Sequence, residues 1–138
     1  MSIKHITASA VAGNVETQFT TPDNTQRRFL FGNLLLTTDA TVADRWVRLH
    51  LSDDAGNNIL CLCAGNSVAA SQTDQRFSYL QGVYREASFI NGVIQVPIAK
   101  DLILPPGYRL DVLIENGVAG DAYSCDLMVD DTHIGARI

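Results

Sequence analysis

Cysteine and histidine are the residue types with the most obvious capacity for chemistry in this chain of 138 residues, which has three of each. Cys61 and Cys63 are two positions apart, so a strand through them places both thiols on one face. A zinc site needs four ligands, and the sequence has no second Cys/His pair at a suitable spacing. We therefore predict that both cysteines are small buried core residues and not metal ligands.

The remaining candidate groups are isolated in the sequence. His5, His50 and His133 lack partners nearby, and we expect His50, beside Arg48, to be solvated or hydrogen-bonded. There is no Gly-x-Ser-x-Gly elbow, phosphate loop or dinucleotide fingerprint. The Asp and Asn residues of segment 53–58 lack the spacing of a calcium loop and suit a hairpin turn. We predict no catalytic residues, no metal site and no cofactor, and hence a protein that is not an enzyme.

Composition restricts the classes of partner. The chain is 46% hydrophobic and 18% charged, as expected for one globular domain, and its net charge of −5 disfavours binding to nucleic acid or to an anionic membrane. Lys4 and Lys100 are the only lysines against eight arginines, a balance that favours protein–protein contacts. No signal peptide and no apolar run of about 18 residues is present, so we expect synthesis in the cytoplasm without secretion.

The elements that must position these residues are strands, because the dominant hydrophobic period is two. Apolar and polar residues alternate in segments 46–52, 93–98, 108–115 and 123–129, which is typical of half-buried strands in an antiparallel sheet. Segments 28–37 and 59–64 are apolar on both faces, which indicates either central strands or strands buried between subunits.

Turn signals separate the strands at short intervals. They are the segment 53–58, the Asn91–Gly92 hairpin signal, Leu104-Pro105-Pro106-Gly107, and the segment 116–121. No helical periodicity extends over ten or more residues. The fold class that follows is all-β: an antiparallel β-sandwich, a jelly roll of about eight strands, with little helix.

The domain organisation that we predict is an N-terminal strand or extended arm over residues 1–26, followed by the sandwich over 27–138, in one domain. The polar stretch around residues 15–23 suits an element that reaches toward a partner. Five residues are our candidates for contacts with other protomers or with a larger protein assembly: Val15, Phe19, Arg27, Arg28 and Trp46. We expect Asp126, Asp130 and Asp131 to form a solvated acidic edge that discourages strand addition.

A series of motifs follows in order along most of the chain. The series consists of LTTDATVADRWV at 36–47, the hairpin at 54–57, AASQT at 69–73 before an aromatic strand with Phe77 and Tyr79, LPPGY at 104–108, and Gly120–Asp121. This order resembles a family of small tailed-bacteriophage proteins encoded among virion structural genes. The resemblance covers residues 29–130. The end of the chain departs from it, because segment 129–133 lacks the aromatic residue common in that family.

The resemblance implies a β-sandwich virion protein without a cofactor, similar to cement or decoration proteins that sit as homotrimers on the capsid surface and contact the major capsid protein. The alternative is a carbohydrate- or receptor-binding module of a phage head fibre or tail, with Trp46 and Phe19 as the stacking residues. A small enzyme on a jelly-roll scaffold is disfavoured, because metal-dependent enzymes of that architecture need a histidine cluster.

Overall fold

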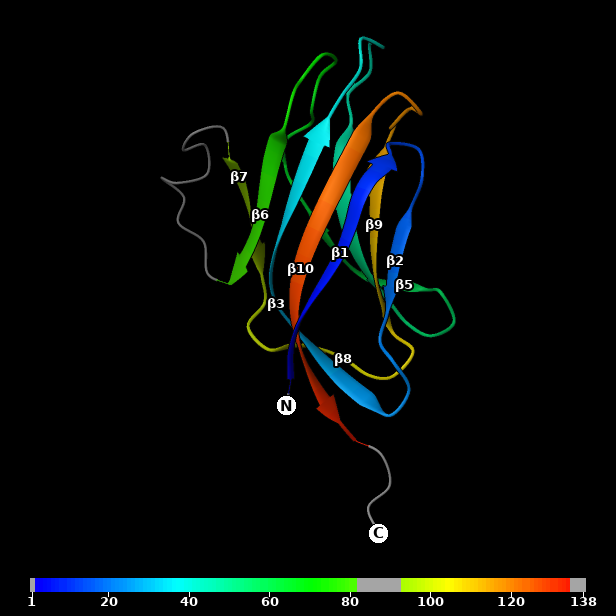
Figure 1. Ribbon diagram of the computed structural model, residues 1–138, viewed down its shortest axis with the longest axis vertical. Coiled ribbons are helices and arrows are strands. Elements are labelled where there is room, and N and C mark those ends of the chain that lie inside the picture. Colours follow the sequence, from blue (N-terminus) through cyan, green and yellow to red (C-terminus); the bar gives the residue numbers. More distant parts are fainter. Residues whose placement is uncertain (1, 82–92, 135–138) are drawn as a thin grey trace.

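The computed structural model describes residues 2–81 and 93–134, and in this part of the chain all regular structure is β-strand (Figure 1). The strands are β1 Ser2–Ala12, β2 Thr17–Thr20, β3 Thr25–Thr37, β4 Trp46–Ser52, β5 Asn58–Cys63, β6 Gln75–Gln81, β7 Val93–Ile98, β8 Leu102–Leu104, β9 Arg109–Glu115 and β10 Ala122–His133. The predicted all-β class is confirmed. No helix suited to crossing a membrane occurs among the described residues.

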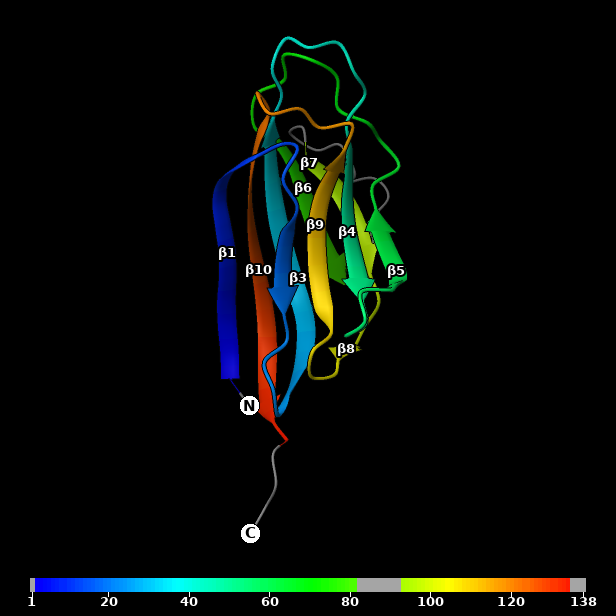
Figure 2. The ribbon, with the colours of Figure 1, turned by 90° about the vertical axis from the view of Figure 1, so that its right-hand side faces the viewer.

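The strands form two sheets packed face to face, as the edge-on view in Figure 2 shows. Sheet A has the order β1-β10-β3-β6-β7, with β8 beside β3, and sheet B has the order β2-β9-β4-β5. Four antiparallel pairs are nested in the sequence, each within the span of the one before: β1 with β10, β2 with β9, β3 with β6, and β4 with β5. A single long hairpin that is rolled up gives this nesting. That is the jelly-roll arrangement.

The remaining two strands extend sheet A. β8 pairs with the start of β3, and β7 pairs with β6 in parallel orientation. The expectation of purely antiparallel pairing is therefore wrong at β7, although the alternation in segment 93–98 predicted the strand itself. The Asn91–Gly92 turn signal lies outside the described residues.

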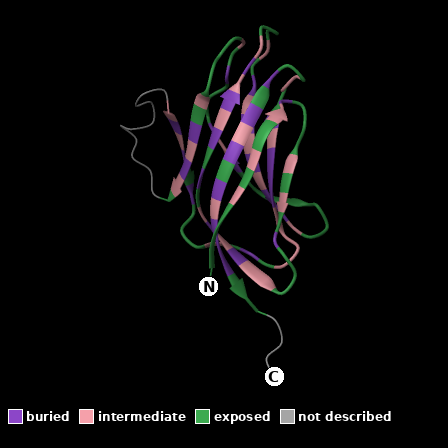
Figure 3. Cartoon of the chain, in the orientation of Figure 1, coloured by how far each residue is buried: buried purple, intermediate pink, exposed green. Residues whose placement is uncertain are grey.

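Alternation of burial along each strand shows why these segments form a sandwich (Figure 3). In β4, Val47, Leu49 and Leu51 are at most 5% exposed, while the residues between them lie on the outer face. β3, β6, β9 and β10 contribute in the same way, whereas the edge strand β1 has no buried residue. The centre is filled by Phe29, Phe77, Leu104 and Leu110, each 0% exposed. Burying such side chains stabilises the fold by about 1.5–3 kcal/mol each.

The region 1–26, expected as a strand or an arm, contains β1 and β2 of the sandwich, and β3 begins at Thr25. β1 pairs with β10 from Ser2 opposite Asp131, and β2 pairs with β9. The hydroxyl of Tyr123 donates a hydrogen bond of 2.7 Å to the carbonyl of Val15, which holds the connection between these strands. Thr21 is buried, and its N–H bonds the carbonyl of Tyr108 at 2.8 Å. This stretch is thus held against the two sheets.

Candidate functional site

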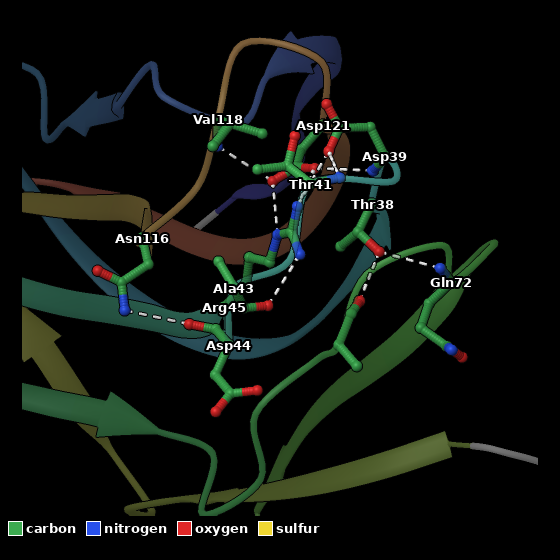
Figure 4. Close-up of polar contacts among 11 residues, drawn as sticks. Thr38, Asp39, Thr41, Ala43, Asp44, Arg45, Gln72, Asn116, Val118 and Asp121 are labelled. Carbon is green, nitrogen blue, oxygen red and sulfur yellow. Dashed lines mark hydrogen bonds and ion pairs between the residues drawn. The ribbon is translucent and has the colours of Figure 1, made fainter.

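A network of polar contacts around Arg45 holds together the loops at one end of the sandwich (Figure 4). The Arg45 side chain is fully buried, and its guanidinium donates to both oxygens of Asp121, at 3.0 and 3.1 Å, and to Asp39 Oδ1 at 3.0 Å. Its third nitrogen donates to the carbonyl of Ala43 at 2.8 Å. Every nitrogen of the guanidinium therefore donates within the protein, and four of its five N–H groups are engaged in these contacts.

Asp121 receives further support from the backbone. The N–H groups of Asp39 and Val118 donate to its two oxygens at 2.9 and 3.1 Å. Burial opposes ionisation of this carboxyl, but the hydrogen bonds from Arg45 and from the two N–H groups outweigh it and lower the pKa of Asp121. The carboxylate is thus held charged. The arrangement has the properties of a structural brace and not of an acid–base catalyst.

A second loop is joined to the same end by Thr38. Its hydroxyl donates to the carbonyl of Ala69 at 2.6 Å and accepts from the N–H of Gln72 at 2.9 Å. Arg45 and Val68 exchange two backbone hydrogen bonds, at 2.9 and 2.8 Å. These contacts fix three loops, around residues 38–45, 64–74 and 116–121, to one another.

The opposite end of the sandwich carries two arginine–aspartate pairs. Arg27 donates to both oxygens of Asp131, at 2.8 and 3.0 Å, and Arg28 donates to Asp130 at 3.1 Å. Asp130 and Asp131 are each 5% exposed, so the prediction of a solvated acidic edge is wrong for these two residues. The adjacent arginines of β3 neutralise them. Asp126 alone among the three is exposed.

An open depression lies beside these pairs, lined by Gln26, Arg28, Ile103, Asp130 and Thr132. Asp130 Oδ1 is buried there without a hydrogen-bond partner among the described residues. The depression is open to solvent, and Ile103 in its lining is 40% exposed. Such an open shape is poorly suited to enclosing a small ligand.

The β5 edge of sheet B is the most apolar unprotected edge that the described residues present. Among the described strands, β5 pairs with β4 alone, and none of them pairs with its other side. Ile59 and Leu60 are 57% and 39% exposed, and the segment NILCLC has no charged residue. Segment 59–64 was expected to be either a central strand or a strand buried between subunits. Its position at the edge of sheet B excludes the central strand. Segment 28–37, by contrast, lies in β3 between β10 and β6, as predicted for a central strand.

Cys61 and Cys63 lie on the outer face of β5 and not in the core. Cys61 is exposed and Cys63 half-buried, so the prediction that they are buried core residues is wrong. The two sulfurs are joined as a disulfide, with a Cα–Cα distance of 5.5 Å. A His50 ring nitrogen and the two sulfurs all lie within 4.8 Å of one another. The alternation of β5 sends Leu62 inward and leaves its neighbours outside.

Charged residues of β4 and β9 surround this group on the same face. Arg48 Nη1 lies 3.5 Å from Cys63 Sγ, and Arg48 also pairs with Glu115. Asp111 of β9 stands directly opposite His50 in the strand register and is 2% exposed. Its Oδ1 has no hydrogen-bond partner within the described part of the chain. The outer face of sheet B thus combines two sulfurs, an imidazole, a guanidinium and a buried carboxylate.

Comparison with known proteins gives no family. No protein-family model matches the chain, and no curated protein matches its sequence. Among solved structures, the chain is similar to infectious bursal disease virus, Gx strain, with a TM-score of 0.45 and 13% identity over 98% of this chain and 33% of that chain. The VP2 subviral particle of the same virus gives 0.39 and 14%, over 97% and 33%. The chain spans about a third of the length of these proteins, so its function must be argued from its own features.

The five predicted contact residues do not share one surface. Arg28 lies on the outer face of sheet A and Trp46 on the outer face of sheet B, because each neighbours an inward residue, Phe29 or Val47. Arg27 is 5% exposed, and its guanidinium is occupied by the bidentate pair described above.

The other two members of the set lie near the β1–β2 connection. Val15 is 50% exposed, and Phe19 of β2 is half-buried against the core. Val15 is therefore accessible to a partner, whereas Phe19 contributes mainly to packing.

We did not predict from the sequence that His50 lies beside the two cysteines, although the sequence contains a signal for it. His50 and Cys61 flank the turn at 53–58, and strands that leave such a turn pair residues at nearly equal distances from its centre. The pairing of Arg45 with Asp121 had no such local signal, because 76 positions separate them.

Proposed function

We propose that this chain is a non-enzymatic structural subunit of a virus particle that acts through association of its surfaces. The jelly roll is an architecture widely used by viral capsid proteins. The space between the sheets is filled by apolar side chains such as Phe29, Phe77 and Leu110. This packing leaves the outer surfaces and edges of the described sandwich as the parts that can contact other molecules.

The observation that carries the proposal is the exposed β5 edge. Free edge strands present unpaired N–H and C=O groups, and proteins that remain monomeric protect such edges with lysine, proline or inward-pointing charges. β5 has none of these, and its exposed Ile59 and Leu60 would be covered by a neighbouring subunit. We propose that β5 forms part of the contact between copies of this chain.

Within this structural role, we propose that the chain is a cement or decoration subunit of a tailed-phage capsid. It would sit as a homotrimer on the capsid surface and bridge subunits of the major capsid protein. The ordered motifs between residues 36 and 121 support this role through their resemblance to phage virion proteins. A trimer engaging several capsid sites at once gains effective affinity without any single strong contact. No nucleic acid, membrane or cofactor takes part in this proposal, and synthesis takes place in the host cytoplasm.

Self-association is tested by two matched substitutions. Leu60→Asp and Ile103→Asp place a charge at positions that are 39% and 40% exposed, on β5 and β8 respectively. Light scattering should show a trimer for the unmodified chain and for Ile103→Asp, and a smaller species for Leu60→Asp with unchanged circular dichroism. A monomeric unmodified chain, or dissociation by Ile103→Asp alone, would contradict a β5 interface.

The virion role is tested on particles. Electron microscopy of purified phage should show density for this chain as trimers on the capsid lattice, and mass spectrometry should find the chain in those particles. Density confined to the tail or portal would overturn the cement role while leaving a structural role in place. Absence of the chain from purified particles would overturn both.

A further inference from the structure

The outer face of sheet B holds three metal-ligating groups from neighbouring strands. One ligand atom each from His50, Cys61 and Cys63 lies within 4.8 Å of the other two. Around a tetrahedral zinc ion, bonds of about 2.0–2.3 Å place ligand atoms roughly 3.5 Å apart. For the three groups to surround one ion, the two sulfurs of the disulfide must separate to this spacing and the imidazole must approach them.

The strand pairing fixes these groups in place. His50 stands directly opposite Cys61 across the β4–β5 pair, and Cys63 follows on the same face of β5 two residues later. β4 is bonded on its other side to β9, so the histidine sits on a central strand of sheet B. Sites on paired strands hold their ligands more rigidly than sites on loops.

Asp111 supplies an independent indication of a ligand. Its Oδ2 accepts hydrogen bonds from Ser52 at 2.9 Å and from Arg109 at 3.1 Å, whereas its Oδ1 is buried without a partner in the described part of the chain. It lies opposite His50 in the register. Histidines that bind a metal through one ring nitrogen commonly donate the other N–H to a carboxylate. The free oxygen of Asp111 is suited to accept that bond.

The charge around the sulfurs favours the form that binds metal. A ligating cysteine must lose its proton, and a neighbouring cation stabilises the thiolate. Arg48 provides this cation, with Nη1 at 3.5 Å from Cys63 Sγ. Cys61 is exposed, which leaves a path for the ion to enter and room for water at the fourth position.

We propose that, when the disulfide is reduced, Cys61, Cys63 and His50 bind one Zn²⁺ ion, with Asp111 as the positioning residue for the imidazole. Two thiolates and an imidazole form a ligand set that prefers zinc over magnesium or calcium. The disulfide occupies both sulfurs, so the site exists only in the reduced chain. This inference does not depend on the role of the chain in a particle.

The site is tested by titrating the full-length protein with Co²⁺, an optical substitute for Zn²⁺, after reduction and removal of the reductant under nitrogen. We expect sulfur-to-cobalt charge-transfer absorption that saturates at one ion per chain and disappears on addition of Zn²⁺. The oxidised protein should give no such band. If the reduced protein gives no band, or binds Zn²⁺ no better than the oxidised protein, the proposal is wrong.

Single variants assign the ligands. Cys61→Ser, Cys63→Ser and His50→Gln should each weaken Zn²⁺ binding at least tenfold, and Asp111→Asn should weaken it by about 10–100-fold. Cys125→Ala is the matched control, because this third cysteine is buried in the core and should leave the affinity unchanged. Circular dichroism of each variant checks the fold. Unchanged affinity in His50→Gln, or lost affinity in Cys125→Ala, would overturn the assignment.

Discussion

The guanidinium of Arg45 donates hydrogen bonds to both carboxylate oxygens of Asp121, at 3.0 and 3.1 Å, and neither side chain has any exposed surface. The two residues belong to different loops, and the pair joins them at one end of the sandwich. Removing one member of a buried ion pair leaves the other charge without compensation in a medium of low polarity. The stability of this end should therefore depend on the pair as a unit.

We expect Asp121→Ala to lower the free energy of unfolding by about 3–5 kcal/mol, because the Arg45 charge stays buried and loses its main partner. Urea denaturation followed by circular dichroism measures the change. Asp44→Asn is the control, since Asp44 is exposed and should shift the free energy by less than about 0.5 kcal/mol. Equal effects of the two substitutions would show that the pair contributes little.

Acid should destabilise the fold through two carboxyl groups. Hydrogen bonds from Arg27 lower the pKa of Asp131, and those to Asp121 lower its pKa despite burial, in both cases from the ordinary value of 3.8. A carboxyl with a lowered pKa in the folded state contributes stability above its unfolded pKa, and this contribution is lost as pH falls through the folded value. The urea midpoint should thus be nearly constant from pH 7 to 5 and fall below about pH 4.

A variant separates these groups from the other carboxyls of the chain. Asp131→Asn should lower the urea midpoint at pH 7 and make its fall below pH 4 shallower, because one of the titrating groups is gone. A fall as steep as that of the unmodified protein would mean that other residues cause the acid sensitivity.

Gly117 lies where the chain passes close to Gly13, and a Cβ atom there would overlap the carbonyl of Gly13 and approach Ile114. Because the overlap involves backbone atoms, Gly117→Ala should destabilise the fold by about 1–3 kcal/mol. Gly65→Ala is the matched control, since nothing lies within 4 Å of a Cβ at that position. Thermal unfolding should show a lower melting temperature for the first variant only.

The three cysteines should differ in reactivity. Burial raises the pKa of Cys125 to about 11, so its thiolate is scarce at neutral pH, and the residue lies in the core. After reduction, two thiols of the native protein should react with a thiol reagent within minutes, and the third only after unfolding. Mass spectrometry of the labelled peptides identifies the cysteines that react before unfolding and the one that reacts only after it. Rapid labelling of Cys125 in the native state would contradict the packing around it.

Much of the fold could be predicted from local pattern. Alternation indicated the inward residues of β4, β9 and β10, and the turn residues separated the strands, because both effects act over a few positions. The first 26 residues were harder. β1 has a weak apolar pattern, since it is an edge strand with mostly exposed side chains, and only its partner β10 shows where it lies.

The functional groups were predictable to different degrees. The buried aspartates that pair with Arg27, Arg28 and Arg45 lie 104, 102 and 76 positions away, respectively, and no periodicity links residues across such distances. The meeting of His50 with Cys61 follows from the pairing across one turn, which the sequence shows. Predicting this contact required two inferences together: that the turn at 53–58 pairs His50 with Cys61, and that both side chains lie on the outer face of the sheet.

The pairing of Ser2 with Asp131 also has a mechanical consequence. Because β1 and β10 run antiparallel as neighbours, the segments at the start of β1 and the end of β10 lie side by side at the same end of the sandwich. Tension applied between those segments would separate the hydrogen bonds one after another, like a zipper, whereas a pull along opposite ends would load them all together.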